Sequence, residues 1–333
     1  MNVLKFGGTS VGDVEPLLNV KQIVGSRKEA EVVVVSALGG VTDQLIAMGK
    51  MAERGDTSYI TEFQSIKERH HVIASIIRDP GRREALEKDT DLLLNQLGDL
   101  LRGVSLLHIL TRRTANEIVS FGERCSSMIV SALIEGSTLM DSLDFIKTFH
   151  QGKKDYPDIE LSSKLLSDAF ASFSGKAAIV PGFISRDRDS GEITNLGRGG
   201  SDYTASIIAA ALDAETLEIW TDVDGFMTAD PSLIKTSYVI KELCFSEAME
   251  LCNFGAKIIY PPALYPVCNK DIPIHIRNTF NPDAPGTVIR SRSSSSDATL
   301  TGIASIDDMC LVTLSGPSMV GIIGVDARLF GAL

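Results

Sequence analysis

A glycine-rich turn from Gly197 to Asp202 holds several residues that could bind a ligand. It reads Gly-Arg-Gly-Gly-Ser-Asp and runs directly into the apolar stretch 203–212. Three glycines in four positions let a backbone turn tightly and approach a ligand closely. Ser201 or Asp202 is expected to cap the following helix, whose first N–H groups favour an anion, and Arg198 adds a positive fork. The segment predicts an anion site, with a plain aspartate N-cap as the structural alternative.

Two further glycine turns also follow β-prone segments. Gly7-Gly8 comes after 3–6, and Gly39-Gly40 comes after 31–37. Turns of this kind gather at the carboxyl ends of parallel strands, where ligands bind. Neither the dinucleotide Gly-x-Gly-x-x-Gly pattern nor the Walker lysine pattern occurs, and the protein-kinase motifs are missing as well.

Three charged residues stand where they could meet a charged ligand. Lys5 ends the first strand beside the turn 7–9, which predicts a phosphate site; a solvated lysine is the alternative. Lys257 is a candidate second phosphate cation or a surface lysine. Glu123 lies on an apolar helix face, where it either pairs with Arg124 in solvent or points inward at an ammonium group.

The composition limits the possible partners. The 333 residues are 44% hydrophobic, and 32 Lys and Arg stand against 43 Asp and Glu, a net charge of −11. This balance gives no basic footprint for nucleic acid. No apolar run reaches membrane length, the first residues lack the long apolar core of a signal peptide, and the five cysteines never form Cys-x-x-Cys. We therefore expect a cytoplasmic protein with reduced thiols and no protein-bound metal, since the five histidines lack ligand spacing.

Strands and helices alternate in the way that would position these residues. The β-branched run 31–37 predicts a strand buried on both faces, hence a parallel central sheet. Between 58 and 136, apolar residues recur at helical spacing, and Pro80 separates two of the helices, which predicts a helical subdomain. Further elements are expected in this order: a helix capped by Asp13, strands at 176–184 and 216–223, a capped helix at 246–251 and a strand at 272–277.

The C-terminal part differs in composition. Residues 291–298 are polar and serine-rich, which is typical of a linker. Residues 301–314 are expected to form a strand pair, followed by an amphipathic stretch to Leu333. Because these elements cannot bury their own apolar faces, 299–333 is expected to be the start of a second domain.

Six segments together resemble aspartate kinases. In order they are 5–12 (KFGGTSVG), 36–43 (SALGGVTD), 121–124 (FGER), 197–202 (GRGGSD), 220–225 (WTDVDG) and 254–257 (FGAK). The resemblance covers about residues 1–290 and is strongest to the kinase part of bifunctional aspartokinase/homoserine dehydrogenases. Residues 299–333 resemble the beginning of the family's ACT regulatory region.

The resemblance implies an α/β amino-acid-kinase fold, a three-layer αβα sandwich on a mostly parallel central sheet, with a catalytic domain at 1–290. The implied reaction transfers a phosphoryl group from ATP to L-aspartate, giving 4-phospho-L-aspartate for lysine, threonine and methionine biosynthesis. Mg²⁺ would be held mainly through the ATP phosphates. A homo-oligomer, a dimer in the full-length protein, and a fused homoserine dehydrogenase domain are also implied.

The resemblance assigns the site residues to three groups. Those expected to face the transferring phosphoryl group are Lys5, Gly7, Gly8, Thr9 and Lys257, with Asp202 orienting the lysines or the metal. Those expected to hold the amino acid are Arg198, Ser201 and Thr42 on the α-carboxylate, Glu123 on the α-ammonium, and Ser36 and Phe183 shaping the pocket. Those expected to hold the nucleotide on its adenine and ribose side are Thr221 and Asp222.

Three departures from the family pattern lie around the nucleotide. Met227 replaces a common tyrosine, Ser232 replaces a common arginine, and Tyr260 begins a Tyr-Pro-Pro segment in place of His-Pro-Arg. Two alternatives to an aspartate kinase follow: a kinase of the same fold for another amino acid, or a binding module without turnover. A carboxylate clamp together with an ammonium partner favours a free α-amino acid. The substrate carboxylate is already ionised, so no protein base is expected.

Overall fold

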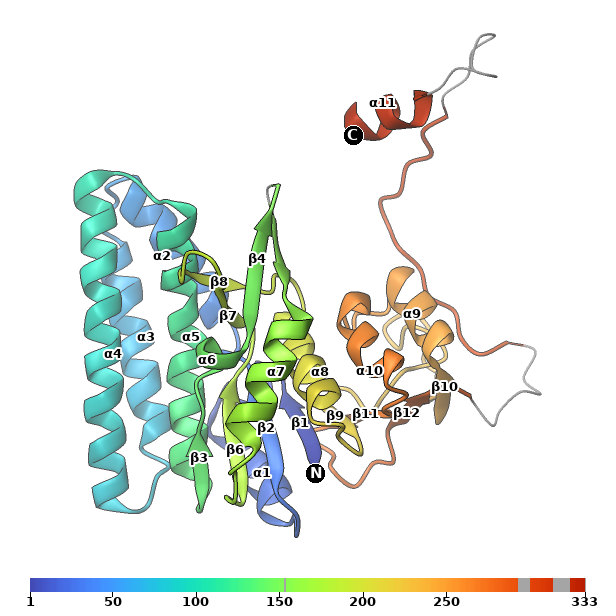
Figure 1. Ribbon diagram of the computed structural model, residues 1–333, viewed down its shortest axis with the longest axis horizontal. Helices are drawn as coiled ribbons and strands as arrows, with labels where there is room; N and C mark the ends of the chain where they lie inside the picture. The colour runs from blue at the N-terminus through green and yellow to red at the C-terminus, as the bar shows by residue number, and fades with distance from the viewer. Residues whose placement is uncertain (153, 293–299, 314–323, 333) are drawn as a thin grey trace.

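The computed structural model describes residues 1–152, 154–292, 300–313 and 324–332. Its centre is an eight-stranded sheet in the order β10-β12-β11-β9-β1-β2-β6-β3, in which β11 and β12 alone pair antiparallel among the described strands (Figure 1). The strands are β1 (Asn2–Phe6), β2 (Glu31–Val35), β3 (Ser137–Leu139), β6 (Ala177–Pro181), β9 (Leu217–Thr221), β10 (Glu242–Cys244), β11 (Ile274–Asn278) and β12 (Thr287–Arg290). The predicted parallel sheet is confirmed, and three of its strands, β3, β10 and β12, were not predicted.

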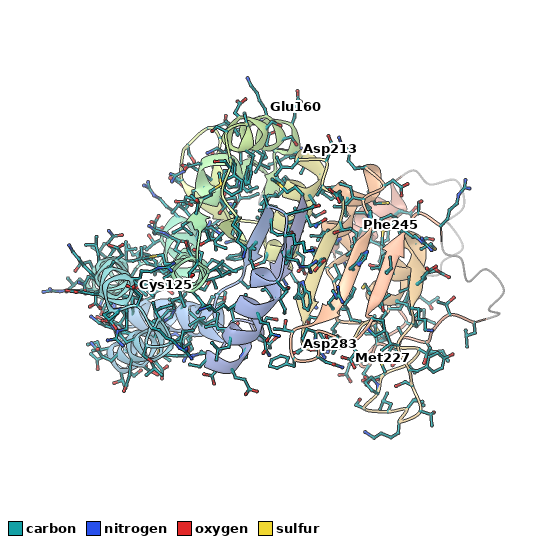
Figure 2. The ribbon with its side chains drawn as sticks, turned by 90° about the horizontal axis from the view of Figure 1, so that it is seen from below. Cys125, Glu160, Asp213, Met227, Phe245 and Asp283 are labelled. Carbon is teal, nitrogen blue, oxygen red and sulfur yellow. The ribbon has the colours of Figure 1, made fainter. Side chains whose placement is uncertain are left out.

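The middle strands are buried on both faces, as their β-branched sequences require. All five residues of β2 are buried, and β1 lies between β2 and β9 with Lys5 opposite Val34 and Ile219. Because β9, β1, β2 and β6 run parallel, their carboxyl ends form one edge of the sheet. In Figure 2, Asp213, which precedes β9, lies on the opposite side of the molecule from Met227, which follows it.

One face of the sheet is covered by the long helices. They are α1 (Val14–Gly25), α2 (Val41–Glu53), α3 (Tyr59–Ala74), α4 (Pro80–Leu107) and α5 (Arg112–Leu133). Their apolar stripes form one core with Leu4, Val33 and Ile179 of the sheet. The Asp13 carboxylate accepts from the Val14 N–H and Asp79 caps α4, which begins at Pro80. The predicted helical segment and these boundaries are confirmed.

The other face carries a second layer of helices. It contains α6 (Ser142–Phe145), α7 (Ile159–Phe170), α8 (Gly200–Ala211), α9 (Phe245–Asn253), the 3₁₀ turn η1 (Pro261–Leu264) and α10 (Tyr265–Asn269). These helices pack on Val3, Val32 and Ile219, whose side chains alternate with those of the first core. The three-layer αβα arrangement is therefore confirmed (Figure 1). None of the described helices is long and apolar enough to cross a membrane.

A second sheet of four short strands was not predicted. Its order is β5-β4-β7-β8, with β4 (Lys147–Gln151), β5 (Lys154–Pro157), β7 (Ile184–Asp187) and β8 (Ile193–Asn195). The single strand expected at 176–184 is in fact β6 and the start of β7, because the chain bends at Phe183, whose φ is 65°. Strand β8 leads directly into the turn at Gly197.

The strand pair expected at 301–314 is wrong for 301–313, which form no strand. Thr301 Oγ1 donates to Glu247 Oε1 and the Ile303 N–H donates to the Thr228 carbonyl at 2.8 Å. The segment thus bonds to α9 and to the loop after β9 rather than to a partner strand of its own. A short helix, α11 (Val325–Ala332), follows. Most of the expected linker, and residues 299, 314–323 and 333, lie outside the described residues.

Candidate active site

A cavity of about 700 Å³, here called the central cavity, opens at the carboxyl edge of the sheet. The sequence-predicted residues that line it come from β1, the loop after β2, α2, α5 and the segment from Phe183 to α8. They are Lys5, Gly8, Ser36, Thr42, Glu123, Phe183, Arg198, Ser201 and Asp202. All six residues predicted to hold the amino acid therefore meet in one cavity.

Lys5 and Asp202 form an ion pair on the floor of this cavity. Lys5 Nζ lies 2.6 Å from Asp202 Oδ1, and each side chain is 11% exposed. Lys5 is therefore not a solvated strand-end lysine. The predicted capping role of Ser201 or Asp202 is wrong: Gly199, with φ 66°, is the N-cap of α8 and no side chain caps the helix. Asp202 lies in the first turn and faces Lys5 instead.

The turn after β1 presents free N–H groups. The Gly7 N–H donates to the Trp220 carbonyl at 3.1 Å and the Ser10 N–H donates to the Gly7 carbonyl at 3.0 Å. In the part of the chain that the structure describes, the Gly8 and Thr9 N–H groups have no acceptor. A Cβ built on Gly7 would lie 3.6 Å from Lys5 Nζ, so the ammonium group lies beside this turn. The arrangement fits an oxyanion such as phosphate.

Glu123 points inward from α5. It is 3% exposed and its Oε2 has no hydrogen-bond partner among the described residues. Burial raises the pKa of this carboxyl to about 8, against the smaller lowering by a hydrogen bond from the Ala37 backbone. The alternative of a solvent-exposed pair with Arg124 is wrong. Glu123 is buried, and the Arg124 guanidinium lies instead over the Phe121 ring, 5.1 Å from its centroid. A cation brought into the cavity would ionise Glu123.

Two helices begin at the central cavity without side-chain caps. Gly40 is the N-cap of α2 with φ 82°, and Gly199 is the N-cap of α8. Their first N–H groups favour a negative charge. Arg198 is exposed at the rim, and Ser201 is 8% exposed beside it. Together these groups can hold a carboxylate.

Close packing explains the glycines of the α8 turn. A Cβ on Gly200 would lie 2.7 Å from Phe183 Cδ2, and a Cβ on Gly199 would overlap the side chain of Tyr260. The Phe183 N–H donates to Thr204 Oγ1 at 3.0 Å, which fixes the bend before β7. The glycines thus let the turn lie against Phe183 and Tyr260 without obstruction.

Lys257 is exposed and lies beyond the central cavity. It lines a second cavity of about 480 Å³ with Arg198, Asp202 and Tyr260. It also lines a third cavity, of about 630 Å³, with the predicted nucleotide residues Thr221 and Asp222. The second cavity shares Asp202 with the central cavity and Lys257 with the third, so it lies between the two.

Hydrogen bonds connect the segments that follow β1, β9 and β11 at the carboxyl edge of the central sheet. Ser10 Oγ lies 2.7 Å from Thr279 Oγ1, and the Thr279 N–H donates to the Thr221 carbonyl at 2.9 Å. Asp224 Oδ1 accepts from the side-chain amides of Asn278 at 2.8 Å and Asn281 at 3.2 Å. Sequence reasoning assigned no role to Thr279, Asn278 or Asn281. Ser10 and Asp224 lay in the segments 5–12 and 220–225, and Thr221 was a predicted nucleotide residue.

The departures from the family pattern have different positions. Met227 lines the third cavity and Tyr260 lines the second. Ser232 lines none of the three cavities. Its N–H and Oγ donate to Asp230 Oδ1 at 2.7 and 2.6 Å. Residues 303–308, which follow the predicted linker, form part of the third cavity's wall.

Comparison with known proteins places this geometry in a family. The model of the amino acid kinase family matches residues 1–278. The chain is 34% identical, over 99% of its length, to the chloroplastic bifunctional aspartokinase/homoserine dehydrogenase 1 of Arabidopsis thaliana and covers 37% of that protein. It is 32% identical, over 98% of its length, to the chloroplastic aspartokinase 1 of the same plant and covers 58% of it.

Solved structures agree with the sequence relatives. Aspartokinase III of E. coli, in complex with aspartate and ADP, superposes with a TM-score of 0.80 and 30% identity over 89% of this chain and 65% of that chain. The aspartate kinase of Clostridium acetobutylicum gives a TM-score of 0.76 and 28% identity over 91% and 66%. The chain thus spans between about one third and two thirds of the proteins that it resembles.

Proposed function

The chain belongs to the amino acid kinase family, and we propose that it transfers the γ-phosphoryl group of MgATP to the side-chain carboxylate of L-aspartate. The products are 4-phospho-L-aspartate and ADP, at the first step of lysine, threonine and methionine biosynthesis. One observation carries the proposal. The central cavity combines a buried, unpaired carboxylate with a cationic rim, and the Lys5–Asp202 pair lies on its floor.

The cavity has opposite charges for the two ends of an α-amino acid. Glu123 supplies a buried acceptor for an ammonium group, because its Oε2 has no partner among the described residues, whereas Asp202, which also lines the cavity, pairs with Lys5. Arg198, Ser201 and the uncapped helix N-termini supply the α-carboxylate site. Binding at both ends would direct the side-chain carboxylate of aspartate toward Lys5 and positions it as the nucleophile.

Lys5 and the free N–H groups of Gly8 and Thr9 would take up the charge of the transferring phosphoryl group. These donors are already held in place by the sheet and by Asp202, so little reorganisation is needed during the reaction. Lys257 lies along the second cavity and would neutralise phosphate oxygens from the other side. No residue needs to remove a proton, because the attacking carboxylate is ionised.

The third cavity is suited to the nucleoside. Thr221 and Asp222 offer polar groups, and Met227 offers an apolar surface. Among the described residues no group of three or more His, Cys, Asp or Glu could hold a metal ion. We propose that Mg²⁺ is held mainly through the ATP phosphates, whose negative charge it would screen.

Trapping the acyl phosphate with hydroxylamine tests the proposal. The chain is incubated with MgATP, hydroxylamine and L-aspartate, L-glutamate or succinate. The hydroxamate is expected with L-aspartate, and succinate, which lacks the ammonium group, should react poorly. Product with another amino acid instead of aspartate would establish the same-fold alternative. Nucleotide and aspartate binding without any hydroxamate would establish a binding module.

Three further expectations have no direct support from the described residues and remain predictions. They are an ACT-like region from residue 299, association into a dimer in the full-length protein and a cytoplasmic location. A fused dehydrogenase is also proposed, and a relative that carries both names supports it. Gel filtration with light scattering of the longer protein would test the dimer.

A further inference from the structure

One side chain of the helical layer joins the two glycine turns at the carboxyl ends of β1 and β2. Arg69, in the second half of α3, donates from Nη1 to the Gly39 carbonyl at 2.8 Å and from Nη2 to the Gly12 carbonyl at 2.7 Å. Its partners lie 30 and 57 residues away along the chain. A planar guanidinium is suited to such a fork, whereas a lysine could reach only one carbonyl well.

The two turns pack against each other with no room to spare. The Gly39 N–H donates to the Gly8 carbonyl at 2.9 Å. A Cβ on Gly39 would lie 3.1 Å from the same oxygen, and a Cβ on Gly12 would lie 2.9 Å from it. The two turns are therefore connected both by direct backbone contact and by the hydrogen bonds of Arg69.

The hydrogen bonds of Arg69 fix the orientation of a peptide group at the site. In a trans peptide the N–H points opposite to the carbonyl. With the Gly39 carbonyl directed at Arg69, the Gly40 N–H is directed away from it, and Gly40 lines the central cavity. This N–H, like that of Gly8, has no acceptor in the described part of the chain.

The charge of Arg69 is not neutralised locally. Both of its bonds end on neutral carbonyls, and no carboxylate among the described residues pairs with it. Arg69 is only partly exposed, so water screens this charge incompletely. A full positive charge thus stands directly behind the two turns that present N–H groups to an anion.

We propose that Arg69 is a positioning residue for phosphoryl transfer: it clamps the turns 7–12 and 38–42 and holds their N–H groups toward the phosphoryl group. The inference rests on the proposed function. The helical layer then positions both parts of the site: α5 carries Glu123 for the amino acid, and α3 carries Arg69, which orients the turns of the phosphate site.

The test compares Arg69→Ala and Arg69→Lys with the control Lys67→Ala. Lys67 lies on the same helix and pairs with Asp91 at 2.8 Å, away from the turns. Arg69→Ala is expected to lower kcat by about 10- to 100-fold and to change KM for aspartate less than threefold. Arg69→Lys should recover part of kcat. Guanidinium at millimolar concentration should raise the rate of Arg69→Ala and leave Lys67→Ala unchanged.

Two readouts do not depend on turnover. Amide hydrogen exchange in 7–12 and 38–42 should be faster in Arg69→Ala than in the control, and calorimetry should show ADP binding weakened about 3- to 10-fold. Unchanged exchange and ADP affinity would overturn the inference, as would a kcat loss that follows melting temperature and resists guanidinium. If the wild type forms no hydroxamate, the proposed function fails, while exchange and ADP binding still decide the role of Arg69.

Discussion

At the carboxyl end of the central sheet Glu123 is buried with a raised pKa, and at the amino end Glu31 is buried in the same way. Burial raises the pKa of Glu123 to about 8 and that of Glu31 to about 7, and each has an Oε2 without a partner among the described residues. Glu31 has Asn2 and Arg27 nearby, which lower its pKa, and it lines none of the three cavities.

The difference between these two carboxyls is access. A perturbed pKa marks both of them, yet only Glu123 opens to a cavity with an opposite-charge rim at its far side. At the amino end, Arg27 already bonds to Glu218 at 2.6 Å, and the Trp220 indole donates to the same carboxylate at 2.9 Å. At the amino end the cation, Arg27, is thus already paired within the protein, whereas Glu123 at the carboxyl end faces a cavity that a ligand can enter.

The largest effect is expected on the floor of the central cavity. Lys5→Met removes the cation beside the free N–H groups and should lower kcat by about 10²- to 10³-fold, with a smaller change in KM for aspartate. At the amino end, Arg27→Met should leave kcat within twofold and lower the free energy of unfolding. Steady-state kinetics and urea denaturation measure both. A loss of kcat greater than twofold in Arg27→Met would contradict the difference between the two ends of the sheet.

The next effect separates the two glutamates directly. Glu123→Gln should raise KM for aspartate about 10- to 100-fold, because a charged hydrogen bond to the ammonium is lost. Glu31→Gln should leave KM unchanged. If KM rises equally in both variants, the carboxyls do not differ as the structure indicates.

Stability should move in the same direction for both glutamine variants. A folded pKa above the unfolded value of 4.5 means that the folded state holds a proton that the unfolded state releases, so stability falls as pH rises. The loss extends from pH 4.5 to about 8 for Glu123 and to about 7 for Glu31. At pH 8, each variant should melt roughly 2–6 °C above wild type, by calorimetry, if the amide fits the site. A lower melting temperature at every pH would contradict the pKa assignment.

A smaller effect is expected at the rim. Arg198→Leu removes an exposed carboxylate partner and should raise KM for aspartate about tenfold while kcat changes little. Initial-rate kinetics over a range of aspartate concentrations measure this. A fall in kcat with constant KM would assign Arg198 to phosphoryl transfer instead of amino-acid binding.

The sequence predicted the parts of the molecule that local pattern controls. The β-branched run of β2 and the helical spacing of α3 to α5 follow from short-range periodicity, and the glycine turns gave the positions of Lys5 and Arg198. The second sheet was missed because its strands have three to five residues and depend on tertiary pairing.

Three other outcomes depended on long-range partners. Asp202 fits the local pattern of an N-cap, whereas the family resemblance implied that it orients the lysines, and in the folded chain its carboxylate pairs with Lys5. Arg69 carries no sequence signal, since its partners are backbone carbonyls far along the chain. Residues 301–313 have the composition of strands but lack a partner strand in the described part of the chain.

Proton release on aspartate binding tests the central claim most directly. At pH 7 a carboxyl with a pKa of about 8 is mostly protonated, and an incoming ammonium group must ionise it. Calorimetric titrations of L-aspartate in two buffers of different ionisation enthalpy should give about 0.9 proton released per site at pH 7. Release should vanish in Glu123→Gln and persist in Glu31→Gln. Aspartate binding without proton release, or release that survives Glu123→Gln, would contradict the account.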